Sequence, residues 1–274
     1  MTTNASAKPA QAAQTNNSES IFPLIVIPAT LVVAVLFYLF FLGNGANFKG
    51  GDSANEPLNV WGIIFKGGFI VPILITLLLL VIIFSIERFL TISRAQGAGK
   101  PDAFLRSIKK SLDANDVNSA IALCDKQKGS LANVVRQGVG KDREMQSEAK
   151  LEKDQKMVAI QKEVEEATTL ELPMLEKNLI ILATIISIAT LFGLIGTVLG
   201  MIRSFAAMSE AGAPNQAELA TGISEALINT ALGISTSAIA IIAYNYFTSS
   251  IDQLTYRIDE AGYSLQQTFA AQNH

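Results

Sequence analysis

The side chains best suited to chemistry lie in and just before a late apolar stretch, residues 226–251. Glu225 and Asn229 are four positions apart, and Thr236 follows on about the same helix face two turns later. A carboxylate at or within a membrane is costly unless it meets a partner or a water-filled cavity. This polar stripe on a helix rich in small residues predicts the wall of a polar pore, although Glu225 could instead reach headgroup water.

A second apolar stretch, residues 178–202, contains Gly193, Gly196 and Gly200, spaced three and four apart. These glycines share one helix face, which lets another backbone approach closely, and Gly233 offers a similar position in the last stretch. Many membrane helices use such faces for packing alone, and Thr197 beside them could simply bond a carbonyl of its own helix. The spacing therefore predicts close helix packing, with no specific chemistry attached.

The remaining composition excludes most familiar enzyme chemistry. Cys124 is the only cysteine and the terminal His274 is the only histidine, so an internal disulfide and a Ser-His-Asp triad are both impossible. We find no phosphate-binding loop, no cluster of metal ligands and, at a net charge of −3, no basic footprint for nucleic acid. We therefore expect no enzyme activity, no cofactor and no bound metal ion.

Four stretches without a charged residue form the framework for these side chains, at residues 21–42, 67–86, 178–202 and 226–251. Each is long enough to cross a hydrocarbon core of about 30 Å as a helix. Only 16% of the residues are charged, compared with about 25% in soluble domains. Because the first twenty residues have only Lys8 as a positive charge, we expect a retained anchor after a disordered tail. The sequence predicts an all-α membrane protein.

Basic residues orient the spans. The segment 88–177 holds most of the 21 Lys and Arg residues, and basic segments stay cytoplasmic, so this segment and both termini should be cytoplasmic. The predicted order is a tail at 1–20, an extra span at 21–42, a periplasmic loop at 43–66, a span at 67–87, a cytoplasmic helical domain at 88–177, a span at 178–203, a periplasmic loop at 204–217, a span at 218–251 and a cytoplasmic helix at 252–274.

The cytoplasmic segment is predicted to be helical. Apolar residues recur at helical spacing from Phe104 to Leu112 and from Val117 to Cys124, and the Asp-Ala-Asn-Asp turn between them supplies an N-cap. Cys124 is therefore expected to be a packed core thiol. Residues 144–177 are rich in strong helix formers, and we expect them to continue the third span as one long helix bent at Pro173.

Two motifs taken together resemble the MotA/TolQ/ExbB proton-channel family. They read Gly193-x-x-Gly196-Thr197-Val-x-Gly200-Met-Ile, then Ile223-x-Glu225-Ala-Leu-x-x-Thr230-Ala-x-Gly233 and Tyr244-Asn245. The likeness extends upstream to Glu87-Arg88-Phe-Leu and is closest to the ExbB/TolQ branch, and to ExbB within it. The pair of motifs is specific, whereas either motif alone would not be.

The resemblance implies a homopentameric ring around the helices of a single-span partner of the ExbD/TolR type, which supplies the aspartate that carries protons. It implies that Thr197, Thr230 and Glu225 line the interior, on pore-lining spans 178–203 and 218–251; Asn229 is our addition from helical spacing. The implied function is a proton-driven motor in the inner membrane of a Gram-negative bacterium, which energises TonB-dependent outer-membrane transport with a TonB-like protein. The four charge-free stretches contain no Asp, Lys or His, which also favours a partner that contributes the proton carrier.

Two departures from the family pattern affect the alternatives. Thr190 and Ile239 stand where family members commonly carry proline, which weakens a flagellar-stator assignment, and the span at 21–42 is additional to a three-span core. A TolQ-like role in envelope constriction stays open within the family. From other classes, a structural membrane scaffold would tolerate Ala, Val or Leu along the polar stripe, and a secondary carrier would commonly show internal repeats, which we do not find.

Overall fold

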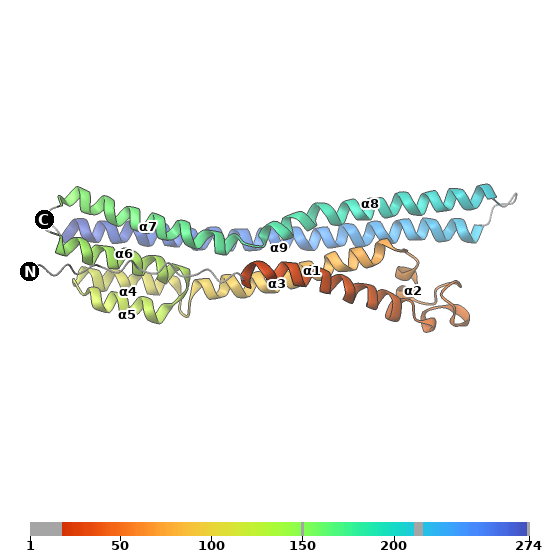
Figure 1. Ribbon diagram of the computed structural model, residues 1–274, viewed down its shortest axis with the longest axis horizontal. Coiled ribbons are helices and arrows are strands. Elements are labelled where there is room, and N and C mark those ends of the chain that lie inside the picture. The colour runs from red at the N-terminus through yellow and green to blue at the C-terminus, as the bar shows by residue number, and fades with distance from the viewer. Residues whose placement is uncertain (1–17, 149–150, 211–215, 273–274) are drawn as a thin grey trace, which may run out of the picture.

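The chain forms an elongated helical bundle in the computed structural model, which describes residues 18–148, 151–210 and 216–272 (Figure 1). Those ranges contain no β-strand. Four helical segments are long and apolar enough to cross a membrane, beginning at Ile21, Ile70, Lys153 and Leu219. The predicted all-α class with four candidate spans is confirmed. Most of the predicted tail, residues 1–17, lies outside the described residues, and Ser18 begins the first helix.

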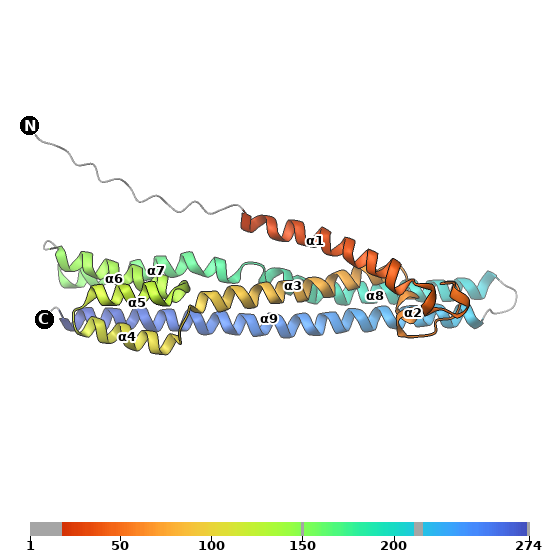
Figure 2. The same cartoon turned by 90° about the horizontal axis from the view of Figure 1, so that it is seen from below.

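The N-terminal part of the chain forms the first span and a small cap beside it. Its elements are α1 (Ser18–Leu36), the π-helical turn η1 (Phe37–Leu42), the short 3₁₀ turns η2 (Gly45–Asn47) and η3 (Lys49–Gly51), and α2 (Val60–Phe65). Helix α1 packs against α3 and lies closest to it near α2 (Figure 2). Toward the N-terminus of α1 the two helices diverge, although the Phe22 ring still meets the Phe84 ring of α3 with centroids 6.0 Å apart. The segment 43–66, expected to be a loop, is therefore partly helical.

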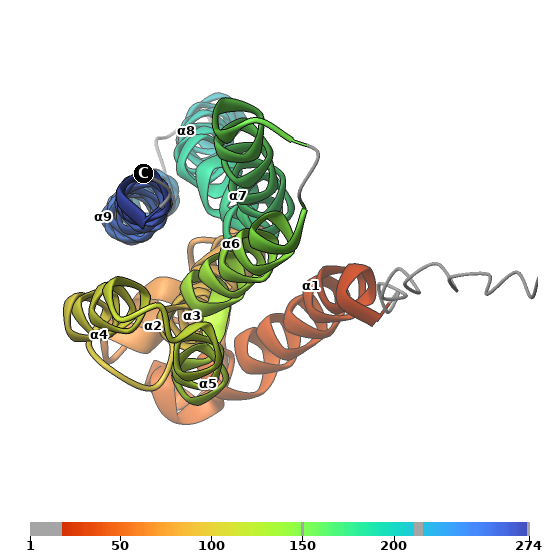
Figure 3. The ribbon, with the colours of Figure 1, turned by 90° about the vertical axis from the view of Figure 1, so that its left-hand side faces the viewer.

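The other three spans pack along one another. They are α3 (Ile70–Gln96), α8 (Leu179–Glu210) and α9 (Gln216–Gln272), and α9 contacts both α3 and α8. Helix α9 has 57 residues and runs along nearly the whole bundle (Figure 2). Viewed along the bundle, α1 and α9 lie on different sides of α3 (Figure 3). The segment 204–217, also expected to be a loop, is helical up to Glu210 and again from Gln216.

The segment 88–177 contains four helices besides the end of α3. They are α4 (Pro101–Asp113), α5 (Val117–Gln127), α6 (Gly129–Ser147) and α7 (Lys153–Glu176). The predicted turn between α4 and α5 is present, and the Asp116 carboxylate accepts a hydrogen bond of 3.0 Å from the Ser119 amide as N-cap. The predicted apolar stripes of α4 and α5 face the core, with Phe104, Ile108 and Cys124 buried.

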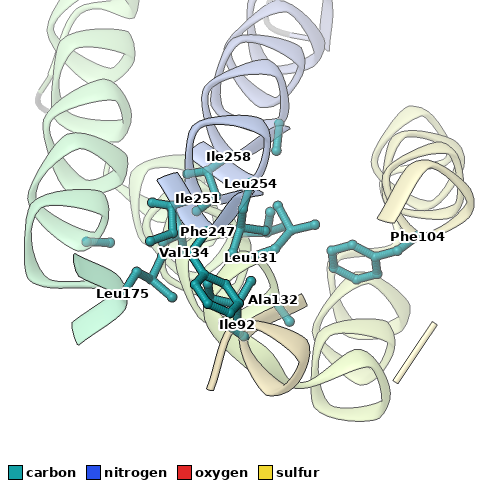
Figure 4. Packing of buried hydrophobic residues seen from close by; sticks show 14 of the residues in the cluster. Ile92, Phe104, Leu131, Ala132, Val134, Leu175, Phe247, Ile251, Leu254 and Ile258 are labelled. Atoms are coloured by element: carbon teal, nitrogen blue, oxygen red, sulfur yellow. The ribbon is translucent and has the colours of Figure 1, made fainter. Parts of the chain in front are cut away.

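One core joins α4, α5, α6 and α7 to the C-terminal part of α9. Buried side chains of α6 and α9, including Leu131, Leu254 and Ile258, meet in this core, and Leu175 of α7 lies beside them (Figure 4). Each such residue removes its apolar surface from water, which contributes roughly 1.5–3 kcal/mol per large side chain. The C-terminal part of α9 is therefore held by packing against the other helices.

The predicted single helix from residue 144 through the third span is interrupted twice. Helix α6 ends at Ser147 and α7 begins at Lys153. Helix α7 continues through Pro173 and ends at Glu176, and Asn178 then adopts φ = +64° before α8 begins. Asn tolerates this left-handed conformation better than most residues. The helix is therefore interrupted at Asn178 and not at Pro173.

Candidate functional site

Helices α8 and α9 approach each other closely along the glycine face. A Cβ atom added at Gly193 would lie 3.1 Å from the Asn229 carbonyl oxygen and 3.2 Å from Gly233 Cα. One added at Gly200 would lie 2.7 Å from the Gly222 carbonyl oxygen, and Gly196 faces the Asn229 side chain. These distances leave no space for a larger residue, so the glycines set how near the two backbones lie.

Two threonine hydroxyls meet across this contact. Thr197 Oγ1 lies 2.5 Å from Thr230 Oγ1, and it also donates to the Gly193 carbonyl oxygen at 3.1 Å. Thr230 Oγ1 lies 3.4 Å from the same carbonyl. Because each hydroxyl can donate only one hydrogen bond, one threonine bonds the carbonyl while the other donates to its neighbour, and the two can exchange these roles.

Glu225 is buried where the C-terminal part of α8 meets the N-terminal part of α9. Its side chain is 6% exposed, and Arg203 Nη1 donates to both carboxylate oxygens at 2.7 and 2.8 Å. The Arg203 side chain is 53% exposed. The pair therefore joins a carboxylate shielded by protein to a guanidinium that lies at the surface of the single chain, and removing the arginine would leave a buried charge without its partner.

Asn229 lies one helical turn from Glu225 and is completely buried. Its Nδ2 donates to the Gly67 carbonyl oxygen at 2.8 Å, and its Oδ1 has no hydrogen-bond partner within the described part of the chain. Gly68 has φ = +75°, and a Cβ there would lie 2.5 Å from Glu225 Oε1. The turn that precedes α3 therefore forms a third wall of the site, after α8 and α9.

The structure brings together the four predicted pore residues Thr197, Glu225, Asn229 and Thr230, and it buries Thr236 further along α9. Sequence reasoning missed Arg203 and the Gly67–Gly68 turn. Arg203 is the first charge after the charge-free stretch 178–202, and the glycine pair directly precedes an apolar run. Both signals were visible, but neither indicated a partner across the fold.

A second polar cluster lies at the other end of the apolar part of α3. Arg88 is 2% exposed, its Nε donates to Glu87 Oε2 at 2.6 Å, and its Nη1 donates to the Leu175 carbonyl oxygen at 3.1 Å. Asn178 Nδ2 contacts the same Glu87 oxygen at 3.4 Å. These contacts hold the C-terminus of α7 and the turn that separates it from α8. We therefore assign this cluster a structural role.

Cys124 and the possible metal ligands offer no further chemistry. Burial raises the pKa of the Cys124 thiol to about 12, so the reactive thiolate is scarce at neutral pH. No group of three or more His, Cys, Asp or Glu residues that could hold a metal ion occurs within the described ranges.

The fold and site together define a multi-pass helical membrane protein with a polar site between glycine-packed spans. Residues 127–260 match the MotA/TolQ/ExbB proton channel family. This is the family that the paired motifs predicted.

Individual relatives include both ExbB and TolQ proteins. The Tol-Pal system protein TolQ of Pseudomonas aeruginosa is 28% identical over 213 residues, which cover 74% of this chain and 88% of TolQ. The biopolymer transport protein ExbB of Pseudomonas putida is 41% identical over 81 residues, covering 30% of this chain and 25% of that protein. An ExbB-like biopolymer transport protein of Synechocystis is 40% identical over 88 residues, covering 31% of this chain and 42% of that protein. The chain thus spans less than half the length of these two ExbB relatives.

Proposed function

We propose that this chain is the ring-forming subunit of a proton-driven motor in the inner membrane of a Gram-negative bacterium. Five copies surround the membrane helices of an ExbD/TolR-like single-span partner, and both termini of each copy lie in the cytoplasm. Proton flow past the ring changes its contacts with the partner. The motor then acts, as an ExbB protein would, through a TonB-like protein on outer-membrane transport.

The observation that carries this proposal is the buried Glu225 carboxylate, set between α8 and α9 near two hydroxyls that exchange donor and acceptor roles. Glu225 and Thr230 are five residues apart on α9, or about 7.5 Å along the helix axis. Asn229 lies between them with an acceptor oxygen that has no partner in the described part of the chain. The site can therefore bind water or a partner side chain and pass a proton, whereas its lack of further carboxylates favours a second protein as the proton carrier.

The test is proton flux through the full chain, purified with its single-span partner and reconstituted into lipid vesicles that contain a pH-sensitive dye. Glu225→Gln should abolish most of the flux, because Gln keeps the shape of the side chain but cannot ionise. Glu260→Gln changes an exposed carboxylate of the same helix and should leave the flux unchanged. Equal flux in all three proteins would refute the role of Glu225, whereas a wild-type complex that conducts no protons would favour the scaffold alternative.

A TolQ-like role in envelope constriction is the second candidate, because the TolQ relative aligns over 88% of its length. The two roles separate in cells. The chain should restore receptor-mediated uptake to a strain that lacks its own ExbB if the ExbB-like proposal is right. Restoration of envelope constriction alone, in a strain that lacks TolQ, would assign the chain to the second role.

A further inference from the structure

The N-terminal segment that precedes the three-span core reaches the Glu225 site through a continuous set of contacts. Tyr38 of η1 stacks on Phe65 of α2, with ring centroids 4.7 Å apart and an interplanar angle of 18°. The Tyr38 hydroxyl also donates to the Phe65 carbonyl oxygen at 3.0 Å. Both the ring and the hydroxyl of Tyr38 therefore hold the last residue of α2.

The cap around this contact is fixed by two amide side chains, of which Asn47 is buried and Asn59 is exposed. Asn47 Nδ2 donates to the carbonyl oxygens of Phe41 and Leu42 at 2.8 and 3.0 Å, which ties the cap to the end of η1. Asn59 Nδ2 donates to Asn47 Oδ1 at 2.9 Å, and the Asn59 side chain is also the N-cap of α2. Because the buried Asn47 amide is paired with η1 on one side and with the N-cap residue of α2 on the other, it ties the position of α2 to that of η1.

The chain passes directly from Phe65 into the turn that forms the third wall of the site. Within the next three residues, the Gly67 carbonyl accepts the Asn229 amide at 2.8 Å. Gly68 lies so close to the carboxylate that an added Cβ would be 2.5 Å from Glu225 Oε1 and 3.3 Å from Arg203 Nη1. A shift of Phe65 would therefore move the backbone that Asn229 and Glu225 contact.

We infer that the extra N-terminal segment is a positioning element for this site, with Tyr38 and Phe65 as its positioning residues. The segment holds the Gly67–Gly68 turn against Glu225 and Asn229, which orients the Asn229 amide and closes one side of the carboxylate. The inference rests on the proposed function in one respect, because that proposal is what makes this site a proton site. The contacts themselves belong to the single chain and need no partner.

The experiment measures the rate at which dicyclohexylcarbodiimide labels Glu225 in the full chain in lipid vesicles, resolved by peptide mass spectrometry. Tyr38→Ala removes the stacking and the hydrogen bond and should raise the rate at least about fivefold, the factor that corresponds to one ordinary hydrogen bond. Tyr38→Phe keeps the stacking, should remain folded, and should raise the rate by a smaller factor. Phe40→Ala removes a neighbouring aromatic ring that is 73% exposed, so it is the matched control and should leave the rate unchanged.

Labelling of Glu225 that does not rise in Tyr38→Ala and Tyr38→Phe would overturn the inference, and so would an equal rise in the Phe40→Ala control. Proton flux, measured in parallel with the single-span partner, separates this result from the proposed function. If the labelling rises as expected while the wild-type complex conducts no protons, the proposed function fails and the positioning role stands.

Discussion

At the scale of single residues, Glu225 is set apart by its surroundings on three sides. Arg203 of α8 donates to both carboxylate oxygens. The backbone of Gly68 packs directly against the carboxylate, and α9 itself supplies the buried Asn229 one turn away. A buried carboxylate held in this way is costly for stability unless its partner stays in place. The proposed role of Glu225 in proton flow would account for a buried carboxylate at this position.

A second buried carboxylate, Asp142 of α6, gives a pH-dependent prediction. Asp142 is 4% exposed, Gln146 Nε2 donates to its Oδ2 at 3.1 Å, and its Oδ1 has no hydrogen-bond partner in the described ranges. Burial raises the pKa of this carboxyl from 3.8 to about 6. The folded protein thus holds the proton more tightly than the unfolded chain, and this contribution to stability is lost as the pH rises from about 4 to about 6.

Replacing Asp142 by Asn should therefore stabilise the protein above about pH 7 by roughly 2–3 kcal/mol, because the variant no longer buries a charge. Below about pH 3 the difference should vanish, since the aspartate is then protonated in both states. The measurement is the thermal midpoint of the full chain in detergent across this range. Asp113→Asn, at an exposed position, is the control, and an Asp142 variant whose midpoint follows the wild type at every pH would contradict the prediction.

At the scale of elements, the α8–α9 contact depends on glycines whose missing side chains leave no room for replacement. A Cβ at Gly200 would lie 2.7 Å from the Gly222 carbonyl oxygen and 2.8 Å from the Ala226 nitrogen, both of them backbone atoms. A flexible side chain could rotate away from such a contact, but helix backbone cannot. The helices themselves would have to separate, and the threonine pair and the Glu225–Arg203 pair both span this contact.

Gly200→Ala should accordingly lower the free energy of unfolding by about 1–3 kcal/mol, the usual cost of overpacking. Gly140→Ala is the matched control, because Gly140 is also helical but has no atom within 4 Å of its added Cβ. That variant should be neutral or stabilised by up to about 1 kcal/mol, since alanine is the better helix former. Thermal midpoints in detergent compare the two, and a Gly200 variant as stable as the Gly140 variant would show that the helices are not held at this distance.

At the scale of the whole molecule, the spans expose apolar side chains that one copy cannot cover. Exposed large residues occur along α8 and α9, among them Leu191, Val198, Leu227 and Ile234. Lipid can cover such surfaces, and so can neighbouring copies of the chain. Arg203 is half-exposed in the single chain. A neighbouring subunit or the partner, bound over this surface, would change the contact of Arg203 with water.

The proposed ring predicts a mass of five 29.3 kDa chains for the purified complex in native mass spectrometry. Co-expression with the single-span partner should add the mass of the partner chains to this pentamer. A monomer or dimer that does not bind the partner would contradict the ring, and it would leave the scaffold and carrier alternatives standing.

Much of this protein could be predicted from the sequence because the signals are local. Charge-free runs predicted four membrane-spanning helices, since length and hydropathy are properties of a continuous segment. Spacing placed Gly193, Gly196 and Gly200 on one face and Glu225 with Asn229 on another, since residues three or four apart on a helix are neighbours. The paired motifs indicated the family that residues 127–260 match.

Only the tertiary structure decided which groups these faces meet. The Asn229 amide bonds a carbonyl 162 residues away in the chain, and Glu225 is paired with Arg203 from the opposite helix. Periodicity shows which side of a helix is polar, but it contains no information about the partner that packs there. The contact of Tyr38 with Phe65 has the same origin, because it depends on a neighbour that is brought close only when the bundle packs.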